Sequence, residues 1–371
     1  MAERSVADEA VYESLARALD ALPNGFPRTA SGVELAILRR IFSPEEAFIA
    51  AHLRREAETP AAVAARCGRA ADELAALLKA MAKRGLAWPD YDRATGERRY
   101  RLAPFIVGIY EAHLHLMDHE MAHLVEQYLA EGGAVGLMSP QPALHRVLPA
   151  RSTAPTEWIL PYEDVVAILK EAETFSVRDC ICRVQQEHVG RRCDFPLRMC
   201  LTMAYHKRPP RPEDISFAEA LAIVDRAEEL GLVHAVSNMA NGLYYVCNCC
   251  GCCCAILRGI TDFGIANSIA RSNYVAVVDA ATCDGCEICT GRCQVGAMRM
   301  EGGVATVDAA RCIGCGLCVS GCPSKAARLE RLPEAETIHP PVDFAAWEEE
   351  RLRHRHLWQG SAAAPGTVDA P

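Results

Sequence analysis

The sequence of 371 residues lacks the signatures of several large classes of protein. It has no uninterrupted run of 18 or more apolar residues, so it predicts no membrane-spanning helix. It has neither a phosphate-binding G-x-x-x-x-G-K-[ST] loop nor a G-x-G-x-x-G turn between a strand and a helix, and no G-x-S-x-G nucleophile elbow. The first 15 residues lack the basic, apolar and cleavage regions of a signal peptide. We therefore expect a cytoplasmic protein.

Positive charge is also in short supply. The 39 Lys and Arg residues are outnumbered by 48 Asp and Glu, which gives a formal net charge of −9. This balance argues against non-specific nucleic-acid binding by the whole chain, although it leaves a basic patch on one domain open. Cysteine, in contrast, is abundant at 19 residues. Without an export signal, so many thiols indicate metal ligation in a reducing compartment rather than disulfides.

Eight of the cysteines form two matched runs near the C-terminal end. Each run has the spacing C-x2-C-x2-C-x3-C, and every cysteine of the second run stands 29 positions after its counterpart. The runs are Cys283, Cys286, Cys289 and Cys293, then Cys312, Cys315, Cys318 and Cys322. A Val-Asp-Ala sequence precedes both, at 278–280 and at 307–309. This region is therefore an internal duplication.

The duplicated region, 274–329, resembles a bacterial-type two-cluster ferredoxin. In such ferredoxins the fourth cysteine of each run ligates the other cluster. The resemblance implies two [4Fe–4S] clusters, the first held by Cys283, Cys286, Cys289 and Cys322 and the second by Cys312, Cys315, Cys318 and Cys293. One departure is Gln294, which stands where a proline often follows the fourth cysteine. The alternative is a pair of zinc knuckles, but zinc sites rarely use a third cysteine at this spacing in both halves of a repeat.

Residues 1–104 carry signals for several helices followed by a hairpin. The sequence predicts five helices, at 6–22, at 32–42, one that begins at 44, at 60–68 and at 71–84. It also predicts strands at 86–88 and 98–102. This order resembles a winged helix. A DNA-reading helix needs polar or basic residues at its start, whereas this one opens with Asp72 and Glu73. We therefore favour a protein-docking role and keep DNA binding as the alternative.

A single long helix is predicted from Pro104 to Glu131, ended by Gly132 and Gly133. Its apolar face contains Ile106, Tyr110, Met117, Met121, Leu124 and Tyr128. His115, His119 and His123 fall on the opposite face at helical spacing. Such a row can bind a metal ion, but a solvated polar face is the interpretation that we favour.

The central region, 134–272, holds ten further cysteines in two groups. They are Cys180, Cys182, Cys193 and Cys200, then Cys247, Cys249, Cys250, Cys252, Cys253 and Cys254. We expect thiolates from both groups to build one further iron–sulfur cluster, or two. Zinc in a four-thiolate site and a redox-active dithiol are the alternatives. Vicinal cysteines on a strand point to opposite faces, so Cys249 and Cys250 require an irregular backbone to share one metal.

Several features lie together in residues 35–330: the winged-helix-like start, the segments PFIVGIYE, DCICR, GLVH and CNCCGCCC, and the C-terminal ferredoxin-like region. Taken together, they resemble a widespread group of predicted iron–sulfur proteins of anaerobic and facultative microbes. That resemblance implies 4Fe–4S binding and electron transfer. We therefore predict an α+β multidomain protein divided at 1–104, 105–133, 134–272, 273–332 and 333–371, the last part being a charged helix at 343–359 and a disordered tail at 361–371. Its expected partner is a redox protein, and the alternative function is a redox-sensing winged-helix regulator of transcription. Whether it turns over a substrate stays open.

Overall fold

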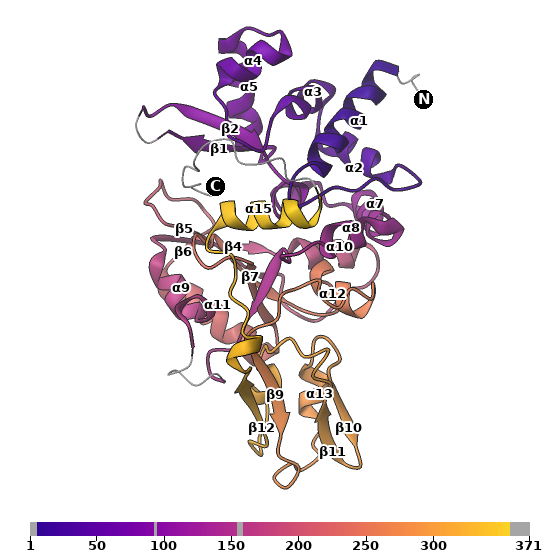
Figure 1. Cartoon of the computed structure of the whole chain (residues 1–371), viewed down its shortest axis with the longest axis vertical. Coiled ribbons are helices and arrows are strands. Elements are labelled where there is room, and N and C mark those ends of the chain that lie inside the picture. The colour runs from indigo at the N-terminus through magenta and orange to yellow at the C-terminus, as the bar shows by residue number, and fades with distance from the viewer. Residues whose placement is uncertain (1–5, 93–94, 154–158, 357–371) are drawn as a thin grey trace. The chain divides into compact units, whose positions relative to one another are not determined.

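The computed structural model describes residues 6–92, 95–153 and 159–356, and it shows a mixed α+β protein with several sheets (Figure 1). The chain divides into two compact units, one drawn from residues 1–140 and 348–371 and the other from residues 141–347. Among the described residues, no helix combines the length and the apolar character needed to cross a bilayer.

The first unit is mainly helical. Its elements are α1 (Val6–Asp20), α2 (Val33–Ile41), α3 (Pro44–His52), α4 (Pro60–Cys67), α5 (Ala71–Lys83), β1 (Ala87–Tyr91), β2 (Arg98–Leu102), α6 (Tyr110–Ala112), α7 (His119–Tyr128) and α8 (Ala134–Met138). The predicted capping signals act as expected, since Ser43 and Glu46 form a capping box on α3 and Gly68 ends α4 in the left-handed conformation. The hairpin of β1 and β2 is also confirmed, and Glu58 adds a short bridge to Tyr100 on its edge.

The long helix predicted from Pro104 to Glu131 is wrong, because the chain is broken there into short segments. The backbone of Met117 leaves the helical region, and the carboxylate of Asp118 then caps α7 by accepting a hydrogen bond from the Met121 N–H. An aspartate at this position favours a new N-terminus over a continued helix. His115 consequently lies on a different segment from His119 and His123, so the predicted row of three histidines does not form.

The predicted charged C-terminal helix is present as α15 (Phe344–His354), and the second half of it belongs to the first unit. Its Arg351 is fully buried and donates hydrogen bonds to the carbonyl groups of Pro23, Leu137 and Pro140. The tail at 361–371, which the sequence predicts to be disordered, lies outside the described residues.

The second unit contains both cysteine-rich regions. Its elements are β3 (His145–Leu148), α9 (Val165–Glu171), β4 (Thr174–Asp179), α10 (Ile181–His188), β5 (Arg198–Ala204), β6 (Asp214–Ile215), α11 (Phe217–Leu230), β7 (Val233–Ser237), β8 (Tyr245–Cys249), α12 (Ala255–Thr261), β9 (Tyr274–Val278), α13 (Ile288–Arg292), β10 (Met298–Glu301), β11 (Val304–Val307), α14 (Leu317–Ser320) and β12 (Ala327–Arg331).

In the described part of this unit, six strands form one antiparallel sheet in the order β3-β7-β8-β5-β4-β6. One face of the sheet packs against α9 and α11, because alternate strand residues such as Leu201, Met203 and Val246 join Val224 of α11 in a buried apolar core. The residues between them, including the cysteines of β5 and β8, therefore point to the opposite face. The sheet thus separates two environments for thiols.

The duplicated region folds as two matched two-stranded sheets. β9 pairs with β12 and β10 pairs with β11, each antiparallel, and a short helix in each half contains the third cysteine of its run. Both halves are labelled at the bottom of Figure 1, where β9 to β12 are drawn in shades of orange. The two pairings bring the last cysteine of each run next to the other half, as described below.

Candidate metal centres

The first cavity of the duplicated region is lined by cysteines from both runs. Cys283, Cys286 and Cys289 of the first run face it together with Cys322, the last cysteine of the second run. Its other walls include apolar residues such as Val278 and the polar residues Asp284, Glu287 and Ser324. The second cavity repeats the arrangement with Cys312, Cys315, Cys318 and, from the first run, Cys293.

The two cavities differ in their exposure. Around the first cavity, Cys286 and Glu287 are exposed and the apolar Ile288 is 44% exposed. Around the second, Cys318 and Leu317 are buried. The second loop is covered by the central region, since the Ala150 N–H donates to the Cys315 carbonyl and the Ser272 hydroxyl donates to the Gly314 carbonyl. The first cavity is therefore the one nearer to solvent.

Local electrostatics follow this difference in burial. Burial raises the pKa of the Cys315 thiol to about 12 and also raises that of Cys318. At Cys322, burial works in the same direction, but hydrogen bonds from backbone N–H groups of residues 325–327 and from the Ser324 hydroxyl lower the pKa overall. A bound iron ion supplies the positive charge that buried thiolates such as Cys315 and Cys318 otherwise lack.

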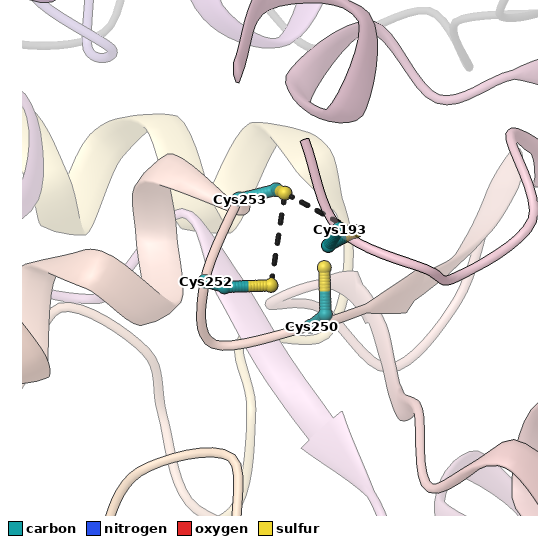
Figure 2. Close-up of side chains that lie close together, drawn as sticks. All are labelled: Cys193, Cys250, Cys252 and Cys253. Carbon is teal, nitrogen blue, oxygen red and sulfur yellow. Dashed lines mark hydrogen bonds between the residues drawn. The ribbon is translucent and has the colours of Figure 1, made fainter. Parts of the chain in front are cut away.

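Four of the central cysteines form a compact cluster, which we call the four-thiol group: Cys193, Cys250, Cys252 and Cys253 (Figure 2). Their sulfur atoms all lie within 4.8 Å of one another, and the Cys253 sulfur lies 3.5 Å from that of Cys193 and 3.7 Å from that of Cys252. Cys250 and Cys253 are buried against Met199, Ala227 and Leu232, on the side of the sheet that α11 covers. The group can therefore bind one metal ion.

The spacing of the four-thiol group suits a single ion. A tetrahedral zinc site with Zn–S bonds of about 2.3 Å places its sulfurs roughly 3.8 Å apart. The cysteines around the two cavities of the duplicated region form no such tight cluster in the described part of the chain, because no three of their sulfurs all lie within 4.8 Å of one another. Wider spacing around an empty volume suits a four-iron cube, whose ligands bind its separate corners.

The other six central cysteines are separated from this group. Cys200, Cys247 and Cys249 lie on β5 and β8 and alternate with core-facing residues, while Cys180, Cys182 and Cys254 stand at the starts of α10 and α12. Cys249 and Cys250 thus belong to different sets, because successive residues along a strand point to opposite faces of the sheet. Each set combines cysteines of both sequence groups, from which the sequence predicts one further cluster or two.

Two side chains connect the four-thiol group to the second cavity. Gln294, which follows Cys293, accepts a hydrogen bond of 2.7 Å from the Gly251 N–H and donates one of 2.8 Å to the Gly231 carbonyl. Arg292, which precedes Cys293, donates to the carbonyl groups of Glu228 and Glu229 at the end of α11. The backbones of Gly251 and Gln294 lie so close together that a Cβ atom on Gly251 would stand 2.0 Å from the Gln294 carbonyl oxygen. Gly251 thus allows a close approach of two chain segments.

Arg183 is a buried cation that lies beside the central thiols. Its buried guanidinium group donates 2.7 Å hydrogen bonds to the carbonyl groups of Pro196 and Asn248. Burial opposes its charge, but the neighbouring thiol groups of Cys180 and Cys250 raise its pKa overall. Since Cys180 belongs to the six cysteines and Cys250 to the four-thiol group, Arg183 can balance negative charge on both.

Comparison with known proteins agrees with this geometry. Residues 276–323, which include all eight cysteines of the two runs, match the family model of the 4Fe-4S dicluster domain. The chain therefore carries a 4Fe-4S dicluster domain, which implies two [4Fe–4S] clusters and indicates iron–sulfur electron transfer. No curated protein and no solved structure matches the chain.

Sequence reasoning noticed Gln294 but did not find its role. The signal was the glutamine in the place of a proline, since proline has no amide side chain to bond a neighbouring loop. Arg183 is one of several arginines near these thiols in the sequence, and nothing in the sequence distinguishes it from exposed ones such as Arg192. The role of Arg292 also could not be found, because its partners lie more than 60 residues away in sequence.

Proposed function

We propose that this protein transfers electrons through two [4Fe–4S] clusters and a further central metal centre. The observation that carries the proposal is the pair of cavities within the dicluster domain, each lined by three cysteines of one run and the fourth of the other. We assign Cys283, Cys286, Cys289 and Cys322 to the first cluster and Cys312, Cys315, Cys318 and Cys293 to the second. The clusters would supply one-electron redox chemistry, and the chain would supply thiolates, burial and charge.

Exposure indicates where electrons can enter or leave the protein. The first cavity lies beside exposed Cys286, Glu287 and Ile288, so a redox protein can reach this end of the dicluster domain. The second cavity is covered and lies beside Cys293, whose neighbour Gln294 bonds Gly251 of the four-thiol group's loop. We infer a path from an external partner to the first cluster, then to the second, and then to the central region.

The first test counts cofactors in protein purified without oxygen. Two cubes require about eight irons and about eight acid-labile sulfides per chain, and their reduced forms should give interacting EPR signals. Fewer than about six irons in fully reconstituted protein would overturn the dicluster assignment. One additional iron without extra sulfide would identify a single redox-active ion in the four-thiol group. Zinc there would make the site structural and limit the electron path to the two cubes.

A second test examines the crossed ligand sets through pairs of substitutions. If Cys286 and Cys322 hold one cluster, then Cys286→Ser, Cys322→Ser and the double variant should each lose the same four or so irons. Cys286→Ser with Cys293→Ser should lose about eight, because those residues serve different clusters. Uncrossed ligation predicts the reverse pattern. Cys67→Ser, which alters the lone cysteine of α4, is the matched control and should keep every iron.

For the first unit we propose a winged-helix-like fold over residues 44–102 that docks a protein. Support comes from the acidic first turn of α5, where Asp72 and Glu73 would repel phosphate, and from Arg69, which is already paired with Glu45 and Glu73. The alternative is a redox-sensing regulator of transcription. Salt-sensitive binding to a defined DNA site that changes with the oxidation state of the clusters would establish that alternative.

We also propose a reducing, cytoplasmic location, in keeping with the 19 free cysteines.

A further inference from the structure

Six central cysteines remain after the dicluster ligands and the four-thiol group are assigned. We call them the six-thiol ring: Cys180, Cys182, Cys200, Cys247, Cys249 and Cys254. The backbone brings them together on one face of the sheet. β5 and β8 pair antiparallel with Leu201 opposite Val246, and continuing this register places Cys200 opposite Cys247. Cys249 follows two residues later on the same face.

Contacts between neighbouring thiols complete a ring of six. Each thiol is a hydrogen-bonding neighbour of two others, in the order Cys180, Cys182, Cys254, Cys249, Cys247, Cys200 and back to Cys180. The Cys180 N–H also donates to the Leu197 carbonyl, which anchors the start of α10 beside β5. The cysteines come from four separate elements and are buried or half-buried. Such convergence indicates a built site, because apolar packing alone does not require six thiols.

The six sulfurs do not form a compact group like that of the four-thiol group. In the described part of the chain, no three of these six sulfurs all lie within 4.8 Å of one another, unlike those of the four-thiol group. The six sulfurs are therefore spread more widely than those of the four-thiol group. Thiolates without competing oxygen or nitrogen ligands favour iron–sulfur clusters over hard cations.

We propose that the six-thiol ring binds a polynuclear iron–sulfur cluster, distinct from the two dicluster cubes and from the ion of the four-thiol group. One cube takes four thiolates, so six accommodate a larger cluster or leave two thiolates beside a cube. This site goes beyond the proposed function and adds a second metal centre on the opposite face of the central sheet. Arg183, next to Cys180 and Cys250, lies between the two central centres.

The decisive measurement is the sulfide content of the full-length protein purified without oxygen. The two cubes account for about eight sulfides, and a single ion in the four-thiol group adds none. We expect about four or more additional sulfides and a matching number of irons, seen by Mössbauer spectroscopy as a component besides the cubes. Intact dicluster EPR signals with no sulfide beyond about eight would overturn the six-thiol site while leaving the proposed function standing.

Substitution then locates the extra cluster. Cys200→Ser with Cys247→Ser should remove the additional iron and sulfide and keep the dicluster EPR signals, which report that the chain is folded. Cys252→Ser should remove only the single ion. Retention of all sulfide in the Cys200 and Cys247 variant overturns the proposal. So does the finding that the six cysteines of the native protein are paired as disulfides, by alkylation and mass spectrometry before and after reduction.

Discussion

The dicluster domain and the central sheet both gather thiols, but they do so by different means. In the dicluster domain, two short loops carry three cysteines each, and only the fourth ligand of each cavity comes from the other half. In the central region, no short segment supplies all the cysteines of a site. The four-thiol group takes Cys193 from a loop before β5 and three cysteines from the turn after β8, 57 or more residues later.

This difference has a consequence for stability. A local loop needs only its own turn conformation to present its ligands, whereas the central sites need the whole sheet to be in register. Changes in the sheet or in its contacts should therefore disturb the central centres more than the dicluster clusters. The following predictions use substitutions at the boundary between the two regions to test this dependence.

The largest effect is expected from Gly251→Ala. The added methyl group would stand 2.0 Å from the carbonyl oxygen of Gln294, which belongs to the backbone and cannot rotate away. We expect a loss of roughly 3 kcal/mol in the free energy of unfolding, together with loss of the ion of the four-thiol group. Anaerobic urea denaturation and metal analysis measure both.

Gly291→Ala is the matched control for that substitution. Gly291 lies in α13 of the dicluster domain, and a Cβ atom there meets nothing within 4 Å. Alanine should leave stability unchanged or raise it by about 0.5 kcal/mol, as expected for a helical glycine. Equal damage from the two substitutions would contradict the view that Gly251 marks the critical approach.

A smaller effect is expected from Arg183→Met. The substitution keeps much of the side-chain volume but removes two hydrogen bonds to buried carbonyl groups and a positive charge beside Cys180 and Cys250. We expect a loss of about 2 kcal/mol in stability and weaker metal retention in the central region only. The iron of the dicluster cubes should remain, and its loss to the same extent would remove the distinction between the two regions. Arg192→Met, at an exposed site, serves as the control.

Gln294→Leu should have a more moderate effect, because it removes hydrogen bonds without changing the backbone contact. The Gly251 N–H and the Gly231 carbonyl would each lose a partner, at a cost of about 1–1.5 kcal/mol. Transfer of electrons from the dicluster to the central region, followed by stopped-flow absorbance after reduction, should slow. Pro323, the counterpart of Gln294 in the second run, is exposed, and Pro323→Ala should leave both readouts unchanged.

Much of the dicluster domain could be predicted from the sequence because its ligands are encoded by local spacing. The repeat of 29 residues indicated both loops, and the matched cavities lie where these loops fold. The central region resisted such prediction, since its ten cysteines are sorted by strand pairing and by the side of the sheet that each faces. Only the alternation at Cys249 and Cys250 could be anticipated. The long helix from 104 to 131 failed because the capping by Asp118 outweighed the apolar periodicity.

The smallest effect is expected from Glu228→Gln, and it concerns how the free energy of unfolding depends on pH. The buried carboxylate of Glu228 accepts hydrogen bonds from the Arg151 N–H and the Ser152 hydroxyl and contacts His234, which bonds Asn248 between Cys247 and Cys249. Burial raises the pKa of Glu228, but His234 and these hydrogen bonds lower it overall below its ordinary value of 4.5. A lowered pKa stabilises the folded state above pH 4.5, and this contribution is lost as the pH falls through the folded-state value.

Glu228→Gln should therefore cost about 1 kcal/mol near pH 7 and progressively less below pH 4.5, as measured by anaerobic urea denaturation across this range. Glu229→Gln, at an exposed neighbour, should change stability by no more than about 0.5 kcal/mol. A difference between wild type and Glu228→Gln that stays constant down to pH 3.5 or so would show that the carboxylate charge does not brace the strand.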